Sequence, residues 1–201
     1  MNRVYILKLE KAIFSFNLKL FQDSFNQLKN AGIILNEEEF AEILLVSSGF
    51  DKFMIGDFLS KEKEPNINGK LLRLYMEKID FREVQFLDGI RFLLSRINLP
   101  QDSTLILGIL DVFTQVYNND NFGKFKDSNV LYLLASTIFA INTLFHKNMA
   151  NMPSLKKEDF VRMNKEIDPY ILEGIYEEVK INKLDFTYEC NIRILNKSFI
   201  F

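Results

Sequence analysis

The acid Asp102 lies in the segment RINLPQDSTLI, residues 96–106, between two long helical patterns of apolar residues. An aspartate just after a proline at a helix start is a good N-cap, because its carboxylate accepts hydrogen bonds from the first free backbone N–H groups. A carboxylate at such a junction can also present its charge to a bound molecule. The segment therefore supports two interpretations of Asp102: a helix cap alone, or a cap that also does chemistry.

The other motifs that carry chemistry are missing from the sequence. No G-x-x-x-x-G-K-[ST], G-x-G-x-x-G, H-E-x-x-H or C-x-x-C motif occurs. One histidine, His146, and one cysteine, Cys190, cannot build a usual zinc site, so we expect no metal and no cofactor. His146 lies in a strongly apolar pattern, which favours a structural histidine over a member of a Ser-His-Asp triad. The paired carboxylates in NEEEF, EKEP and IYEEV have polar neighbours, which is typical of solvated surfaces.

The composition is typical of one globular domain. The chain has 201 residues, 48% of them apolar, and a net charge of −2, which provides no strong field for nucleic acid. The lone Cys190 fits a reducing compartment. The start, MNRVYILKLEKAIFSF, mixes Lys and Glu into its apolar run and is therefore not a signal peptide. The longest apolar stretch, 130–145, contains four polar residues and is shorter than a membrane span, so we expect a buried central helix in a cytoplasmic domain.

Period-3.6 patterns of apolar residues predict an all-α chain of about ten helices. Asn36 and Glu39 form a capping-box pattern, Ser154 is a candidate N-cap, and Asp168 with Pro169 forms an N-cap and N1 pair. Gly32 is expected to end the second helix. The tail, 182–201, is compatible with a short helix or an extended strand. The expected helices lie at about 4–15, 21–31, 37–49, 50–60, 71–78, 83–96, 102–117, 128–146, 155–164 and 169–180.

Four stretches, in the right order, resemble the Sec-seven domain, the exchange domain for Arf-type small GTPases. GFDKFMIGDFLSKEKEPN (49–66) resembles G-L-x-K-x-x-I-G-D-[YF]-L-[GS], and FLDGIRFLLSRINLPQDSTLI (86–106) aligns with the motif that contains L-P-G-E-A-Q-K-I. LYLLASTIFAINTLFHKN (131–148) aligns with Y-x-L-x-x-x-x-I-M-L-N-T-D-L-H-N-P, and EDFVRMNKEID (158–168) with E-x-F-I-R-M-N-R-G-I-N. The N-D-G-G-D insertion of the family is missing before LEGIYEEVK. The resemblance covers about residues 16–182.

The resemblance implies about ten helices in a right-handed superhelix with an apolar groove. In this family the groove grips the GTPase switch regions, and a glutamate at its lip enters the nucleotide site. The position that matches this glutamate is Asp102, which keeps the charge but is one methylene shorter. The resemblance implies that a partner-binding groove is formed by Leu99, Pro100, Ile106, Phe139, Ala140, Asn142, Thr143, His146 and Lys147.

Several groove positions differ from the family pattern. Gln101 replaces the glycine before the glutamate and Leu107 replaces an acid. Ala140 replaces a methionine, Leu144 an aspartate and Lys147 an asparagine, whereas Ile106, Asn142, Thr143 and His146 are retained. The scaffold therefore persists while several positions that touch the GTPase in the family have changed.

Three functions follow from this pattern. The first is an exchange factor for an Arf-like GTPase, with the exchange domain at 1–182. We expect it to be a monomer that binds the GDP-bound and the nucleotide-free GTPase. Its expected location is the cytoplasm, with transient association at Golgi or endosomal membranes. The second is a non-catalytic module that binds a GTPase or a helix in the same groove. The third is a helical scaffold whose groove is plugged by its own apolar tail, 183–201. No lipid-binding domain is recognisable, so membrane association is expected through the GTPase, the N-terminal helix or another protein.

Overall fold

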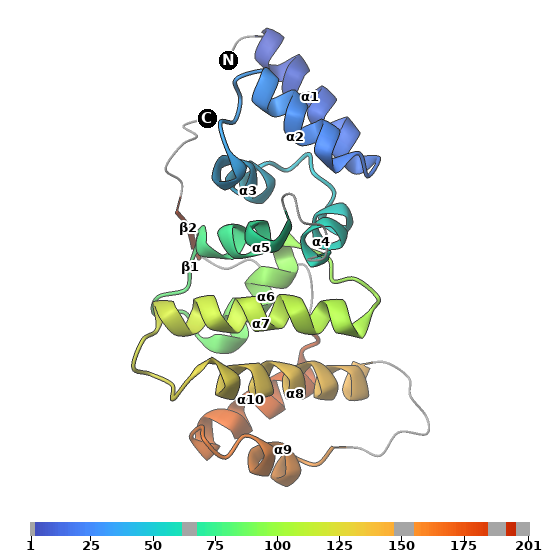
Figure 1. Ribbon diagram of the computed structural model, residues 1–201. Helices are drawn as coiled ribbons and strands as arrows, with labels where there is room; N and C mark the ends of the chain where they lie inside the picture. Colours follow the sequence, from blue (N-terminus) through green and yellow to red (C-terminus); the bar gives the residue numbers. More distant parts are fainter. Residues whose placement is uncertain (1–2, 62–67, 147–154, 185–191, 196–201) are drawn as a thin grey trace. The chain divides into compact units, whose positions relative to one another are not determined.

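The computed structural model describes residues 3–61, 68–146, 155–184 and 192–195, and within them the chain is almost entirely helical (Figure 1). The all-α prediction and the count of about ten helices are confirmed. The described residues form α1 (Arg3–Asn17), α2 (Phe21–Asn30), α3 (Glu37–Val46), α4 (Lys52–Ser60), α5 (Asn68–Glu77), β1 (Ile79–Asp80), α6 (Phe86–Arg96), α7 (Ser103–Asp120), α8 (Ser128–His146), α9 (Lys157–Met163), α10 (Pro169–Ile181) and β2 (Arg193–Ile194).

Local chemistry sets most of the helix ends. The Asn36 side chain accepts a hydrogen bond from the Glu39 amide at 3.0 Å, and the Glu39 carboxylate accepts one from the Leu35 amide at 2.7 Å. Asp168 accepts a bond from the amide of Tyr170 at 2.8 Å and so caps α10, as predicted. Gly32 follows α2 with φ +68°, a conformation that glycine adopts without a steric penalty.

The prediction of Ser154 as the N-cap of α9 is wrong. The helix begins at Lys157, its N-cap is Lys156, and the Lys156 side chain makes no capping hydrogen bond. Ser154 itself lies outside the described residues, as does Lys147. Serine is a residue type that often caps helices, but the N-cap position of α9 is two residues after Ser154.

The tail follows the extended alternative where it is described. Arg193 and Ile194 form β2, which pairs antiparallel with Ile79 and Asp80 of β1. The Leu195 amide donates to the carbonyl of Lys78 at 2.7 Å. The remaining tail residues, 185–191 and 196–201, lie outside the described part of the chain, so a tail that fills the groove stays a prediction.

The fold divides into two compact units. The first comprises Met1–Asp80, Arg96–Ile109 and Ile192–Phe201, and the second comprises Phe81–Ser95 and Leu110–Asn191. The core of the first unit is aromatic: the fully buried ring of Phe16 in α1 contacts a set of four rings at centroid distances of 4.8–6.3 Å. These rings belong to Phe21, Phe40, Phe50 and Phe58.

The second unit has an aromatic core of its own and contains helix α8. Phe81, Phe86, Phe113 and Tyr117 pack with centroid distances of 5.0–5.9 Å. Helix α8 packs against α10 and is long and apolar enough to cross a membrane, by length and composition only. Six of its residues are buried, whereas Leu133 is 42% exposed, so the helix is less enclosed than its sequence predicted.

A buried lysine ties α3 to the end of α5 in the first unit. The Lys78 ammonium lies 2.7 Å from a carboxylate oxygen of Glu38 and 3.3 Å from one of Glu42, whose side chain is fully buried. Burial by itself would lower the pKa of Lys78, but the two carboxylates outweigh it and raise the pKa. The ammonium is therefore charged at neutral pH and compensates the buried carboxylate of Glu42.

Replacing this lysine tests the ion pair. Lys78→Met should lower the free energy of unfolding by about 3–5 kcal/mol, because it leaves the buried Glu42 carboxylate without its ammonium. Urea denaturation followed by circular dichroism measures the change. Lys61→Met is the matched control: Lys61 pairs with Asp57 but is 48% exposed, so its loss should cost less than about 1 kcal/mol. Equal losses for both variants would contradict this role of Lys78.

Candidate functional site

The loop that carries Asp102 joins α6 to α7 and is anchored by apolar side chains. Ile97 is fully buried and Pro100 is buried, so the loop is held against the core at both residues. Leu99 is half-buried, and Gln101 and Asp102 are exposed. The apolar residues of the loop thus fix its path, while its two last residues are presented to solvent.

Helix α4 holds the middle of this loop through its backbone. The Asn98 amide donates to the carbonyl of Lys52 at 3.0 Å. On the same side, the carbonyl oxygen of Asn98 lies 1.8 Å from where a Cβ atom on Gly56 would stand. Only glycine permits this approach, since any side chain would collide with a backbone atom. Gly56 therefore determines how close the Asp102 loop lies to α4.

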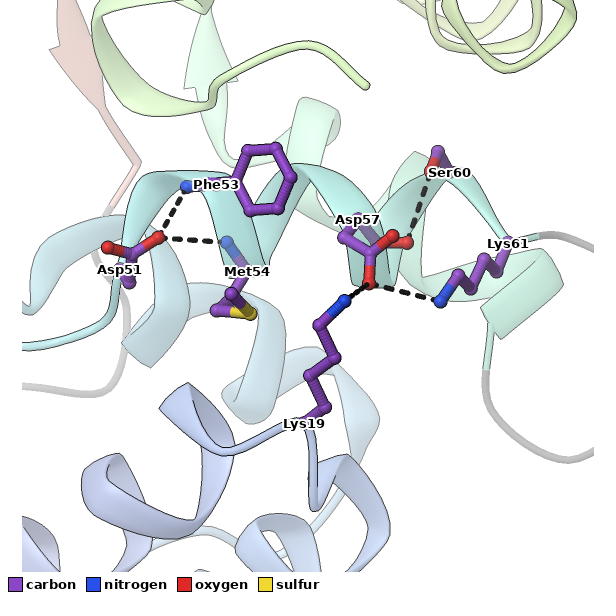
Figure 2. Close-up of polar contacts among 7 residues, drawn as sticks. All are labelled: Lys19, Asp51, Phe53, Met54, Asp57, Ser60 and Lys61. Atoms are coloured by element: carbon purple, nitrogen blue, oxygen red, sulfur yellow. Dashed lines mark hydrogen bonds and ion pairs between the residues drawn. The ribbon is translucent and has the colours of Figure 1, made fainter. Parts of the chain in front are cut away.

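The same helix is tied to the N-terminal helices by Asp57, the next residue. Figure 2 shows the Asp57 carboxylate between Lys19 and Lys61, with Nζ to Oδ2 distances of 3.4 and 3.0 Å. Burial would raise the pKa of Asp57, but the two ammonium groups outweigh it and lower the pKa. At the other end, the Asp51 carboxylate accepts bonds from the amides of Phe53 and Met54, at 2.8 and 3.0 Å (Figure 2). Helix α4 is thus fixed at both ends.

Asp102 is the N-cap of α7, which confirms the capping interpretation. Its Oδ1 atom accepts bonds from the amide and the hydroxyl of Thr104, at 2.8 and 2.6 Å. Its carbonyl accepts the first helical bond, from Ile106 N at 3.1 Å. The Thr104 hydroxyl, followed by the Thr104 amide, lowers the pKa of Asp102. At neutral pH the loop therefore presents an ionised and exposed carboxylate.

The predicted groove residues of α8 fall into two groups. Phe139 and Thr143 are half-buried and Ala140 is exposed, so these three are accessible from outside the second unit. Asn142 and His146 make hydrogen bonds inside this unit. The Asn142 side chain accepts from the Leu184 amide at 2.9 Å, and His146 Nε2 lies 2.7 Å from the carbonyl of Val179. Both side chains therefore position the chain around α10.

The groove itself stays a prediction. Leu99, Pro100 and Ile106 belong to the first compact unit, whereas the α8 residues belong to the second. Within the described residues, no cluster of three His, Cys, Asp or Glu side chains could hold a metal ion.

The comparison with protein families decides what kind of domain carries this loop. A family model described as "Sec7 domain" matches residues 7–184. The chain belongs to the Sec7 domain family. Solved Sec7 structures have the same fold: the "Crystal structure of Sec7p catalytic domain" matches with a TM-score of 0.76 at 22% identity, over 87% of this chain and 95% of that one. The "Structure of ARF1-GDP bound to Sec7 domain complexed with Brefeldin A" matches with a TM-score of 0.78 at 22% identity, covering 90% and 94%.

Curated Sec7 relatives are much longer than this chain. The "Brefeldin A-inhibited guanine nucleotide-exchange protein 4" of Arabidopsis thaliana is 31% identical over 166 residues, which cover 83% of this chain and 10% of that protein. Human "Cytohesin-3" is 28% identical over 150 residues, or 71% of this chain and 36% of that protein. This Sec7 domain thus spans about a tenth of the length of the plant relative.

Three residues of this Sec7 domain were not singled out by sequence reasoning. Gly56 is part of the I-G-D signature quoted above, but its contact with Asn98, 42 positions away, leaves no trace in local patterns. Thr104 was read only as part of the helix, although a threonine two residues after an N-cap aspartate can bond its carboxylate. That spacing is the one feature that could have indicated Thr104.

A glycine comparison tests the role of α4. Gly56→Ala should lower the free energy of unfolding by about 1–3 kcal/mol, because the new methyl group collides with the Asn98 carbonyl. Gly174→Ala in α10 is the matched control. No atom lies within 4 Å of its Cβ position, so alanine should stabilise the helix by about 0.5–1 kcal/mol. Urea denaturation measures both, and stabilisation by Gly56→Ala would contradict the close approach.

Proposed function

We propose that this Sec7 domain accelerates release of GDP from an Arf-type small GTPase and that Asp102 is the acid that does so. One observation carries the proposal: an ionised, exposed carboxylate lies at the start of α7, at the position that the sequence resemblance aligns with the glutamate of the family. Relatives support the reaction class. One of them, 26% identical over 189 residues, is the "ADP-ribosylation factor guanine nucleotide-exchange factor sec71" of Schizosaccharomyces pombe. One solved neighbour holds ARF1-GDP on a Sec7 domain.

Exchange requires no covalent step. A small GTPase holds its nucleotide through a phosphate loop, a lysine and a magnesium ion. A partner that weakens this hold has unfavourable coupling with the nucleotide, and the coupling is reciprocal. The domain that expels GDP is therefore itself expelled when GTP binds, which makes the cycle turn over.

The charge of Asp102 supplies the repulsion. Two unit charges about 4 Å apart interact by about 4 kcal/mol at an effective dielectric near 20. A carboxylate at that distance from the β-phosphate would speed GDP dissociation by about three decades, since each 1.4 kcal/mol is a factor of ten. The same carboxylate competes with the phosphate for the lysine and the metal of the GTPase.

Two features of Asp102 reduce this gain. Its side chain is one methylene shorter than glutamate, which withdraws the carboxylate by about 1.3 Å. Its carboxylate also accepts the cap bonds from Thr104, which would have to open before the carboxylate reaches a phosphate. Opening the cap and approaching the phosphate both cost free energy, so binding of the GTPase to the rest of the surface has to supply it, and the cap bonds reduce the gain in rate.

We expect the remaining partner contacts to follow the predicted groove. Leu99, Pro100 and Ile106 would contact the GTPase beside Asp102, and Phe139, Ala140 and Thr143 would do so from α8. The changes at Gln101, Leu107 and Ala140 point to a partner with a divergent switch surface. The domain would act in the cytoplasm as a monomer, at Golgi or endosomal membranes where its GTPase is bound.

A second function is favoured by the cap bonds themselves. If Asp102 never leaves Thr104, the domain binds a GTPase or a helix in the groove without changing nucleotide release. Fluorescent-nucleotide release and binding, measured on the same Arf-type GTPase, separate the two functions. Acceleration of release supports exchange, whereas binding without acceleration supports the second function.

Asparagine at position 102 removes the negative charge of the side chain but keeps its capping role. Asp102→Asn keeps a good N-cap, so urea denaturation should give the same midpoint as for the wild type. It removes the repelling charge, so GDP release should fall to the rate of the GTPase alone, and Asp102→Lys should behave likewise. Asp168→Asn, at the N-cap of α10, is the control and should leave release unchanged. Full activity of Asp102→Asn would rule out the acidic mechanism.

Glutamate at the same position tests reach. Asp102→Glu restores the missing methylene and should raise the rate of GDP release by about tenfold or more, because the carboxylate moves closer to the phosphate. The measurement is fluorescent-nucleotide release at saturating domain concentration, so that binding does not limit it. A fall in rate would show that the loop is already adjusted to aspartate.

A further inference from the structure

The outer face of α1 carries an exposed apolar stripe. Val4, Leu7, Phe14 and Leu18 are 56, 57, 66 and 56% exposed, and Lys11 is exposed between them. These five positions, which we call the α1 stripe, lie at intervals of three, four, three and four residues, and the last of them, Leu18, directly follows the end of α1. Isolated exposed apolar residues are common on protein surfaces, but an ordered row along one helix marks an interaction site.

The stripe cannot be buried by rotation of its own helix. On the opposite face of α1, Ala12 and Phe16 are fully buried. The Asn17 side chain locks the end of the helix: its Nδ2 donates to Gly49 O at 3.1 Å and its Oδ1 accepts from Asp51 N at 2.9 Å. The following Lys19 reaches Asp57 (Figure 2). The stripe is therefore held rigidly outward, which lowers the entropic cost of binding to it.

The spacing of the stripe selects a helical partner. Alternating intervals of three and four residues form a narrow seam, the pattern by which two α-helices pack side by side. A helix that lies in a lipid surface instead presents a broad apolar face with charges on its other side. Here the other side of α1 is the protein core and a lysine stands in the middle of the seam.

Charge defines the partner further. Helix α1 carries Arg3, Lys8 and Lys11 against one acid, Glu10, whereas the whole chain has a net charge of −2. Lys11 is the middle of the five positions, so a second copy of α1 in full register would place Lys11 against Lys11 in either orientation. Like charges at that layer disfavour self-pairing. A carboxylate on the partner helix would instead pair with the lysine and specify the register.

We propose that the α1 stripe is a docking seam for an acidic amphipathic helix that places a carboxylate opposite Lys11. The seam is independent of Asp102, so the domain can hold this helix whether or not it accelerates exchange. Its apolar layers supply affinity and the Lys11 layer supplies specificity.

A labelled helical peptide tests the seam. The probe has five seam positions at the same intervals, four leucines around a central glutamate, and acids beside the seam that suppress its self-association. Its twin carries lysine at the central position. Fluorescence anisotropy with the full chain should show binding of the glutamate peptide, with the lysine peptide weaker by about tenfold or more. Lys11→Glu should invert this preference.

Matched surface variants locate the binding. Phe14→Ser removes a 66% exposed stripe residue and should weaken binding by about tenfold or more, whereas Phe122→Ser, at a 91% exposed phenylalanine in the second unit, should not change it. Thermal melting by circular dichroism checks that each variant is folded. Equal binding by the two variants, no inversion with Lys11→Glu, or binding of the full chain to anionic phosphatidylserine vesicles but not to the peptide would each overturn the proposal.

Discussion

The close approach of Gly56 to the carbonyl of Asn98 is the constraint on which the site depends. It brings the backbone of α4 against the loop that ends at Asp102, and the bond from Asn98 N to Lys52 O holds that loop in register. Helix α4 is in turn tied to Lys19 through Asp57, so the Asp102 loop is connected through α4 to the segment that follows α1. In the I-G-D run, the glycine therefore leaves room for the Asn98 carbonyl, and the aspartate attaches α4 to Lys19.

The proposal gives Asp102 two roles, one in folding and one in nucleotide exchange. Its cap bonds to Thr104 stabilise the first turn of α7 and keep the carboxylate ionised. Under the proposed mechanism, the same bonds would open before the carboxylate enters the nucleotide site of a GTPase. In the proposed mechanism, opening the cap and approaching a phosphate both cost free energy, and binding of the GTPase would have to supply it.

Helix α1 shows the opposite division of labour, with one face for the fold and one for a partner. The inner face is committed to the aromatic core around Phe16. The outer stripe contributes nothing to that core and keeps Phe14 largely exposed. Because the inner face alone holds α1 in the fold, the apolar row on the outer face can stay exposed without loss of the core.

The residue pattern alone predicted the helices and most of their ends, because periodicity and capping are local. Asn36 and Asp168 cap as predicted, and Asp102 does too, whereas at Ser154 a correct local pattern was overruled and the helix began after Lys156. The β1–β2 pair escaped sequence reasoning, since Ile79 and Ile194 are far apart in the chain.

The family resemblance likewise came from the residue pattern, and the match over 7–184 confirms it. Tertiary structure alone decided which side chains are committed to the fold. It assigned Asn142 and His146 to bonds with Leu184 and Val179, and it left the stripe of α1 exposed. The reason is physical: a helical pattern reveals which faces are apolar, but only three-dimensional packing determines which of those faces is covered.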